Sequence, residues 1–273
     1  MMIIRNLKYT SILILAFYSN SSGAQNIHVA HCLQGCPAGT SETNELVIRH
    51  LFAVSLNEQT GLADWLSYRV IDGSIGIASL LPREWNNDEL ARNSIQFEPL
   101  VGEELVIGRP RSTSSPESSY SVNETVINSS DRGRLVPMSS FAKSSYWPDL
   151  NLLSIMSLIK NDMRVGPWAR LDQRANHLVQ QTGEAYVLVG PIYGNNQSVG
   201  YVGSRNIPSA FFKIIANAQG DISAFVFGQN LAQHTKYCAQ LSDIETVESL
   251  TGLEFFPRVF NWPLGSLDAQ LGC

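Results

Sequence analysis

The sequence predicts a single α+β domain in which helices flank a central antiparallel β-sheet, and three observations support this prediction. The chain has 273 residues, of which 44% are hydrophobic and 16% are charged, as is typical of a folded globular protein. Apolar segments of strand length lie next to one another along the chain and are joined by short turns, which favours antiparallel pairing. Helical periodicity is found between or after these segments, which is the element order of an α+β fold.

The first 24 residues are typical of a signal peptide. Arg5 and Lys8 form a positive start, residues 11–18 form a short apolar run, and small residues at 22–24 predict cleavage after Ala24. The run is far shorter than the roughly 20 residues that a membrane span needs, although a short N-terminal anchor helix is an alternative. We therefore expect a secreted or periplasmic protein with one domain over residues 25–273 and no membrane segment in the mature form.

The predicted mature chain is acidic. Arg5 and Lys8 are the charged residues of the signal peptide, so the 19 basic and 24 acidic residues of the whole chain become 17 and 24, a net charge of −7. Proteins that bind nucleic acid without sequence specificity usually carry a basic surface. A nucleic-acid site in this chain would therefore have to be a local basic cleft on an acidic body.

The N-terminal half of the chain predicts one pair of strands and one long loop. Residues 44–56 are apolar with partial alternation and predict a strand, and residues 65–70 alternate more cleanly and predict its partner. Residues 57–61 would form the turn between them. Residues 112–130 are rich in Ser, Asn and Glu and predict a surface loop.

The C-terminal half predicts two helices and three strands. Apolar residues at three- and four-residue spacing predict a helix over residues 163–181. Residues 184–193 predict a buried strand, and residues 210–216 and 222–228 predict two more strands across a turn at Gly220 and Asp221. Residues 242–251 predict a short helix that begins with Ser242 as its N-cap and ends at Gly252.

The chain contains four cysteines: Cys32, Cys36, Cys238 and Cys273. Export would place them in an oxidising compartment, which favours disulfides, and four cysteines allow three pairings. The first two are close enough for a small local loop, and the last two would hold the C-terminus against the body. A zinc site that includes His28 and His31 is an alternative, although the other two cysteines are not closely spaced.

An ordered series of motifs covers nearly the whole predicted mature chain. Residues 131–137 read Asp-Arg-Gly-Arg-Leu-Val-Pro, residues 166–172 read Gly-Pro-Trp-Ala-Arg-Leu-Asp, and residues 186–193 and 207–213 follow as two apolar motifs. This series resembles the signature of the DNA/RNA non-specific endonucleases, the ββα-metal nucleases, in the same order. Residues 31–37, residues 65–68 and the C-terminal cysteines resemble its secreted Serratia-type branch in particular.

The resemblance implies the ββα-metal (His-Me finger) nuclease fold and the Mg²⁺-dependent hydrolysis of phosphodiester bonds in DNA and RNA. In this family a His is the general base, one Asn holds the Mg²⁺ ion and Arg side chains contact phosphate. The resemblance also implies the disulfides Cys32–Cys36 and Cys238–Cys273, nucleic acid as a partner, and a homodimer.

Three positions that carry the family's chemistry hold residues that oppose it. The general-base His falls on Arg134, whose guanidinium has a pKa above about 12 and cannot accept a proton at neutral pH. The metal-binding Asn falls on Arg164, which offers no acceptor oxygen and repels a cation. A second family Asn falls on Ile155, which cannot hydrogen-bond to water or phosphate. The family implies Mg²⁺, whereas these residues oppose its binding.

Other positions retain the family's chemistry. Arg83, Arg132 and Asn151 match family residues that contact phosphate or line the active site, and Asp131 belongs to the same motif. Asp172 stands where the family has a Glu near the metal-bound waters.

On the predicted helix, Arg164, Trp168, Asp172 and Asn176 would lie along one i, i+4 stripe. We hypothesise that Arg164 fills the Mg²⁺ position with its own charge, beside the carboxylate of Asp131 or Asp172.

Each of these residues also has a purely structural interpretation. Asp131 and Arg132 could form a structural ion pair, and Arg134 and Arg164 could be ordinary solvated arginines. His177 lies near the predicted helix, but it is off the stripe and is expected to be a surface histidine rather than a replacement base.

The sequence thus predicts a secreted homologue of the Mg²⁺-dependent endonucleases that is a catalytically impaired pseudonuclease with a cleft for phosphate, nucleic acid or another polyanion. Two alternatives remain open. One is an active endonuclease with altered catalytic residues, and the other is a protein-interaction module on a nuclease scaffold, since a fold does not fix a function.

Overall fold

A computed structural model describes residues 29–94, 120–122, 125–127, 132–194, 201–202, 205–258 and 265–273. The predicted signal peptide and Asp131 lie outside the described residues. Among the described residues, no helix combines the length and the apolar character that a membrane span requires.

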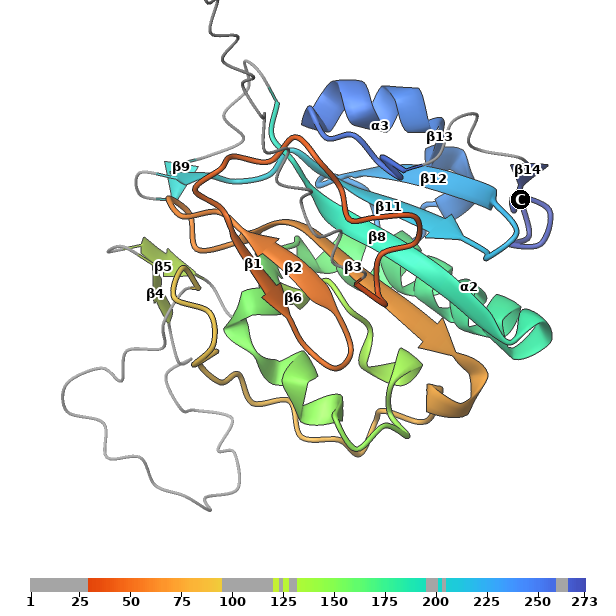
Figure 1. The fold of residues 1–273 in the computed structure, drawn as a ribbon, viewed down its shortest axis with the longest axis horizontal. Coiled ribbons are helices and arrows are strands. Elements are labelled where there is room, and N and C mark those ends of the chain that lie inside the picture. The colour runs from red at the N-terminus through yellow and green to blue at the C-terminus, as the bar shows by residue number, and fades with distance from the viewer. Residues whose placement is uncertain are drawn as a thin grey trace, which may run out of the picture.

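The centre of the molecule is one eight-stranded, mainly antiparallel β-sheet (Figure 1). Its strand order is β1-β2-β3-β8-β11-β12-β13, and β14 runs parallel to β12. The strand bounds are β1 Glu45–Ile48, β2 Ala53–Leu56, β3 Ala63–Ile71, β8 Glu184–Ile192, β11 Ala210–Ala216, β12 Asp221–Gly228, β13 Leu241–Ser242 and β14 Gly265–Ser266. The predicted α+β class with a central antiparallel sheet is confirmed.

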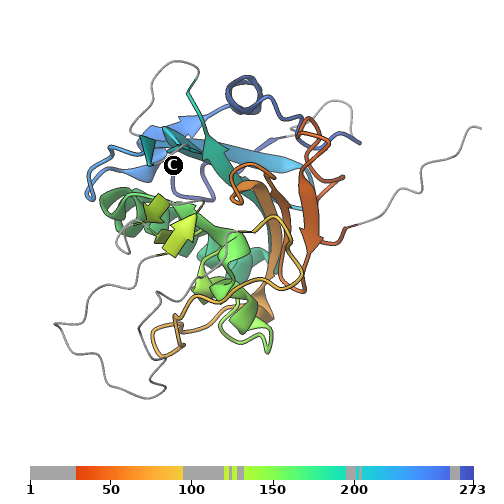
Figure 2. The ribbon, with the colours of Figure 1, turned by 90° about the vertical axis from the view of Figure 1, so that its left-hand side faces the viewer.

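Each face of the sheet is covered by its own helix and has its own apolar cluster. Figures 1 and 2 show α3 (Ile244–Thr251) on one side of the sheet and α2 (Ala169–Thr182) on the other. Strand β11 shows why both faces bury apolar side chains: Phe211 and Ile215 belong to the cluster on the α2 side, while Phe212 and Ile214 belong to the cluster on the α3 side. Alternate residues of a strand point to opposite faces, so a run such as AFFKIIA contributes to two cores.

Shorter elements lie apart from this sheet. Three two-stranded sheets pair β4 with β5, β6 with β7, and β9 with β10; their bounds are β4 Tyr120–Val122, β5 Thr125–Ile127, β6 Arg132–Arg134, β7 Met156–Leu158, β9 Tyr201–Val202 and β10 Arg205–Asn206. The short helices are η1 Asp72–Ser74, η3 Met138–Ser140, η4 Trp147–Asn151, η5 Leu153–Ile155, α1 Asn161–Met163, η6 Arg164–Trp168 and η7 Tyr237–Gln240. Part of the stretch predicted as a loop over residues 112–130 therefore forms β4 and β5, and its remaining residues lie outside the described part of the chain.

The strand predicted over residues 44–56 is wrong as one element, because the structure divides it into β1 and β2. The backbone N–H of Arg49 donates to the carbonyl of Phe52 at 2.8 Å, which closes a tight turn. Leu51 and Phe52 are buried although they belong to the turn, so the apolar pattern runs through it without a break. The predicted partnership with residues 65–70 is confirmed, since β2 pairs antiparallel with β3.

The helix predicted over residues 163–181 is interrupted near its start. Gly166 has non-helical backbone angles, φ −95° and ψ −115°, and the regular helix α2 begins at Ala169. The short helix α3 ends as predicted at Gly252, whose φ of 72° is left-handed. Its N-cap is Asp243 rather than the predicted Ser242, because the Asp243 carboxylate accepts the backbone N–H of Thr246 at 2.6 Å.

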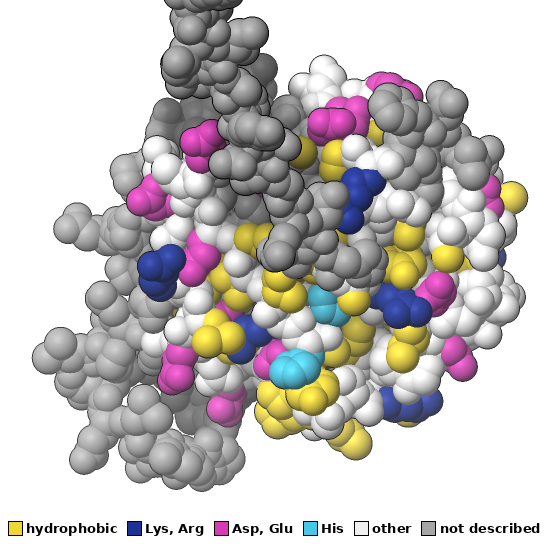
Figure 3. Space-filling model, viewed as in Figure 1, with side chains coloured by type: hydrophobic (Ala, Val, Ile, Leu, Met, Phe, Trp, Pro, Cys, Tyr) yellow, Lys and Arg dark blue, Asp and Glu magenta, His cyan; other side chains and the backbone are white. Residues whose placement is uncertain are grey.

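The surface carries charges of both signs. On the face shown in Figure 3, Lys and Arg side chains lie singly among Asp and Glu side chains, and the described residues form no large patch of one charge there. This arrangement is consistent with the acidic balance of the whole chain, −5 at pH 7.

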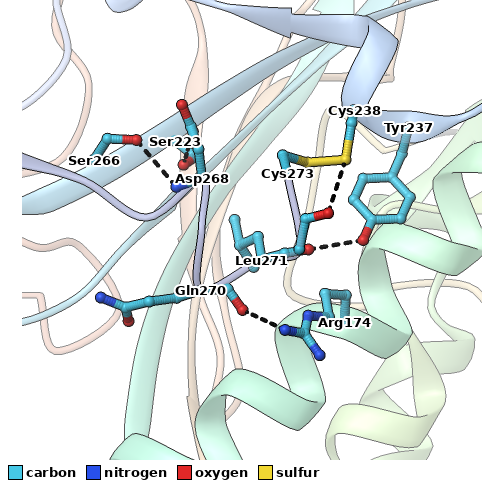
Figure 4. Close-up of a disulfide and its surroundings, with 10 residues drawn as sticks. Arg174, Ser223, Tyr237, Cys238, Ser266, Asp268, Gln270, Leu271 and Cys273 are labelled. Atoms are coloured by element: carbon cyan, nitrogen blue, oxygen red, sulfur yellow. Dashed lines mark hydrogen bonds between the residues drawn. A yellow bond between two sulfur atoms is a disulfide. The ribbon is translucent and has the colours of Figure 1, made fainter.

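Two disulfides join Cys32 with Cys36 and Cys238 with Cys273, so both predicted pairs are present. Figure 4 shows how the second one fixes the C-terminal segment against its neighbours. The Tyr237 hydroxyl donates to the Leu271 carbonyl at 2.7 Å, and the Arg174 guanidinium on α2 donates to the Gln270 carbonyl at 2.8 Å. The C-terminus is thereby tied to helix α2.

Candidate functional site

The predicted site residues meet where β6, β7 and the following helical segment come together. Strand β6 pairs antiparallel with β7, with Arg134 opposite Met156 and Arg132 opposite Leu158. The chain then passes through α1 and η6 into α2. Two short strands followed by a helix thus carry the Arg134, Arg164 and Asp172 positions on one local unit.

Gly133 brings the strand and the helical segment into close contact. A Cβ atom at this glycine would lie 2.8 Å from Cδ1 of Ile159 and 3.0 Å from Cδ of Arg164. The aliphatic stem of Arg164 therefore lies directly against β6. One of its terminal nitrogens donates to Oδ1 of Asn161 at 2.7 Å.

Arg134 is held by the protein on several sides. Its Nε donates to the Leu150 carbonyl at 2.8 Å, and its Nη2 donates to Oδ1 of Asn151 at 2.6 Å and to the Arg83 carbonyl at 3.1 Å. The guanidinium carbon lies 4.2 Å from the centroid of the Trp85 ring, which is a cation–π contact. Three oxygens and an aromatic face thus stabilise a fixed positive charge at the end of β6.

Asn151 and Arg83 surround this charge in different ways. Asn151 is buried, and its amide nitrogen donates to the Pro82 carbonyl at 3.0 Å while its oxygen accepts from Arg134. The Arg83 side chain is exposed, and its nearest described acceptor is the Ala78 carbonyl at 3.5 Å. Of the predicted phosphate-binding residues, Arg83 is therefore the one whose side chain reaches into solvent, since Arg132 is only 7% exposed.

Ile155 and Asn176 support the site from within the protein. Ile155 is fully buried in the apolar cluster on the α2 side, and its carbonyl accepts the backbone N–H of Leu135 at 3.1 Å. Asn176 accepts a hydrogen bond from the Ser140 hydroxyl at 2.6 Å and donates to Ser139 at 3.1 Å. Asn176 thereby holds η3 against α2.

Asp172 is bound to a residue that the sequence interpretation did not include. Its carboxylate accepts a hydrogen bond from the ammonium of Lys213, and the two form a buried ion pair. Lys213 is fully buried, and its nitrogen lies 3.7 Å from the centroid of the Trp168 ring. Of the two carboxylates proposed as neighbours of Arg164, Asp172 is thus paired with Lys213, and Asp131 lies outside the described residues.

The titration of this pair reflects burial. Desolvation raises the pKa of the Asp172 carboxyl and lowers the pKa of the Lys213 ammonium, while their mutual attraction opposes both changes. The sequence indicated a buried charge at Lys213 only in that one lysine stands inside an otherwise apolar strand. A buried lysine requires a carboxylate partner, but the strand itself does not reveal which one.

Comparison with known proteins agrees with this geometry. A model of the DNA/RNA non-specific endonuclease family matches residues 34–261. The chain belongs to this family.

Individual members of the family match most of the chain. A nuclease of Serratia marcescens is 28% identical over 256 residues, which cover 91% of this chain and 88% of that protein. A nuclease of Nostoc sp. is 24% identical over 249 residues and covers 84% and 81% of the two chains. The crystal structure of the EndoG/EndoGI complex contains a chain of the same fold, with a TM-score of 0.56, 16% identity and coverage of 81% and 89%.

Family members generally depend on a metal ion, but the residues at this site do not fit one. The positions that the family resemblance assigns to the general base and the metal ligand hold Arg134 and Arg164, which are positively charged and offer no acceptor oxygen. The nearby carboxylate of Asp172 is already neutralised by Lys213.

Proposed function

We propose that this protein is a catalytically impaired member of the endonuclease family that binds the phosphates of nucleic acid without Mg²⁺-dependent cleavage. The observation that supports the proposal is that Leu150, Asn151, Arg83 and Trp85 hold the guanidinium of Arg134, the residue that the family resemblance aligns with the general base. This guanidinium is a permanent charge in the place where the reaction requires a proton acceptor.

Hydrolysis of a phosphodiester fails at two steps with these residues. The attacking water must lose a proton, and an arginine cannot take it at neutral pH because its pKa lies above about 12. Loss of a general base typically costs about 10²- to 10⁴-fold in rate. Arg164, at the position that the family resemblance assigns to the metal ligand, removes the second contribution, because a guanidinium has no acceptor oxygen and its positive charge repels a cation. The amide oxygen of Asn161 beside it accepts a hydrogen bond from Arg164.

Binding of phosphate remains compatible with the same residues. Arg83 has an exposed side chain, and its backbone carbonyl accepts a hydrogen bond from Arg134, so the two arginines lie on neighbouring segments. Arginine binds phosphate through paired hydrogen bonds, whether or not a metal is present. Because the chain as a whole is acidic, with a net charge of −5, we expect weak binding that decreases steeply as the salt concentration rises.

Export is part of the proposal. The two disulfides support an oxidising compartment, which agrees with the signal peptide predicted over residues 1–24. A homodimer also remains a prediction, and light scattering of the purified protein would determine the mass in solution.

The decisive experiment compares digestion of plasmid DNA and RNA by the wild-type protein and by an Arg134→His/Arg164→Asn double variant, with Mg²⁺ or Mn²⁺. Ile155 is left unchanged, because it is fully buried and an Asn there would place an amide in an apolar core. We expect no cleavage by the wild type and measurable cleavage by the double variant. Cleavage by the wild type that disappears in Arg132→Ala would overturn the proposed impairment.

Binding is measured separately, by fluorescence anisotropy of a labelled oligonucleotide at increasing salt. We expect Arg83→Ala to weaken binding, whereas Arg92→Ala should not. Arg92 is a matched control because its side chain is 90% exposed and, among the described ion pairs, it pairs with Glu45 and not with a residue that contacts Arg134. Equal affinities for the wild type and Arg83→Ala would remove Arg83 from the phosphate site.

A further inference from the structure

An exposed aromatic pair takes no part in the contacts of Arg134. The rings of His50 and Tyr146 are stacked, with their centroids 3.7 Å apart and their planes at 6°. The His50 side chain is 62% exposed and Tyr146 is 47% exposed. Exposed aromatic rings of this kind leave apolar ring surface in contact with water.

The pair joins two segments that are far apart in the sequence. His50 belongs to the tight turn between β1 and β2, and Tyr146 is the N-cap residue that precedes helix η4. Nδ1 of His50 lies 3.9 Å from Oδ2 of Asp149, so a carboxylate lies near the imidazole beyond hydrogen-bond distance. The backbone N–H of Asp149 donates to the Tyr146 carbonyl at 3.0 Å, which connects Tyr146 to the first turn of η4.

Helix η4 connects the pair directly to the Arg134 site. Leu150 and Asn151 at its C-terminal end supply two of the oxygens that hold the Arg134 guanidinium. A 3₁₀ helix rises by about 2 Å per residue, so Tyr146 and Asn151 are separated by about 10 Å along η4. One strand of B-DNA rises by about 3.4 Å along the helix axis per nucleotide, so a strand with stacked bases would place about three nucleotides over this separation.

We propose that His50 and Tyr146 form a stacking platform for an unpaired nucleobase, whose strand continues along η4 toward Arg83 and Arg134. The proposal rests on the proposed binding of nucleic-acid phosphates at those arginines, and it adds the class of ligand, a single strand. Every nucleobase has an aromatic face, so stacking on such a platform does not depend on sequence. This agrees with the description of the family as non-specific. In a duplex these faces are covered by neighbouring base pairs, so a double strand gains nothing from the platform.

The test uses fluorescence anisotropy with three probes of equal length: a single-stranded thymidine oligonucleotide, an abasic phosphodiester strand and a DNA duplex. We expect the wild type to bind the thymidine strand more tightly than the abasic strand. His50→Ala and Tyr146→Ala should each weaken binding of the thymidine strand by about fivefold to a hundredfold and leave the abasic strand unchanged. Tyr146→Phe, which keeps the ring, should bind as the wild type does.

His177→Ala is the matched control, because His177 is an exposed histidine on α2, apart from η4. Circular dichroism of each variant checks that it is folded. If the alanine variants weaken binding of the thymidine strand and the abasic strand equally, or weaken binding of neither, the platform proposal is wrong. In that case the effect of Arg83→Ala still tests the phosphate site independently. If the wild type binds none of the three probes, the proposed function itself fails and the platform with it.

Discussion

At the scale of single residues, Arg134 makes structural contacts at the position that the family resemblance assigns to the general base. We predict that Arg134→Ala lowers the free energy of unfolding by about 2–4 kcal/mol, because Leu150, Asn151 and Arg83 each lose a charged hydrogen-bond donor. Urea denaturation measures the change. The exposed Arg83→Ala should stay within about 0.5 kcal/mol of the wild type. Equal midpoints for all three proteins would mean that the contacts of Arg134 contribute nothing to stability.

Lys213 is the residue whose removal should cost most. Lys213→Met leaves Asp172 as an uncompensated buried charge, and breaking a buried ion pair typically costs about 3–5 kcal/mol. The Lys213→Met/Asp172→Leu double variant should regain most of this loss, because an apolar pair replaces the ionic one. Chemical denaturation of the two variants tests the coupling. A double variant as unstable as the single one would indicate that packing, and not charge, determines the cost.

His31 provides a prediction for pH. Burial lowers the pKa of His31 below its usual 6.5, and a hydrogen bond to the Arg49 carbonyl partly opposes this change. The folded state therefore binds fewer protons than the unfolded state just below pH 6.5, so this contribution to stability is present above that pH and is lost as the pH falls through it. His31→Gln should flatten this part of the profile of unfolding free energy against pH, and the exposed His177→Gln should not.

The sequence motifs identified the chemical positions of the site but not the contacts around them. Arg134, Arg164 and Ile155 were found because they interrupt a pattern that is defined by short spacing. The partners of Arg134 come from positions 16, 17 and 51 residues away, and Lys213 is 41 residues from Asp172. Such pairs depend on how strands and helices pack, so local periodicity and spacing cannot reveal them.

At the scale of elements, Gly166 determines how η6, the segment that begins with Arg164, leads into helix α2. A Cβ atom added to Gly166 would lie 2.7 Å from Cα of Gln233 and even closer to the backbone carbonyl oxygen of Gln233. We predict that Gly166→Ala destabilises the protein by about 2 kcal/mol or more, because backbone must move on both sides. Gly73→Ala is the control, since no atom lies within 4 Å of its added Cβ. Thermal denaturation of both variants gives the comparison, and equal melting temperatures would contradict it.

Elements with regular periodicity were predicted well, and irregular ones were not. Strands β8, β11 and β12 coincide with the predicted apolar segments to within a residue or so, because each forms a continuous buried run. The interruption at Gly166 was not predicted, because the apolar spacing continues across it into α2. The turn between β1 and β2 was hidden for a similar reason, since Leu51 and Phe52 fill the core from within a turn.

At the scale of the whole molecule, the two disulfides should contribute unequally. Cys32 and Cys36 are separated by 4 positions, and Cys238 and Cys273 by 35. Loop-closure entropy predicts a loss of about 2 kcal/mol for a Cys32→Ala/Cys36→Ala variant and about 4 kcal/mol for Cys238→Ala/Cys273→Ala. Urea denaturation of the two variants measures both values. A larger loss for the first pair would show that loop length does not govern the effect.

Under the proposed function, the fixed guanidinium of Arg134 also has an evolutionary consequence. Arg134→His alone would discard the contacts with Leu150, Arg83 and Trp85, while Arg164 would still stand at the position that the family resemblance assigns to the metal ligand. Arg164→Asn alone would leave the proton acceptor missing. Because natural proteins lie only slightly above the stability that selection requires, the change at Arg134 would cost stability before any activity returned. A return to nuclease chemistry would therefore need two changes, neither of which restores activity alone.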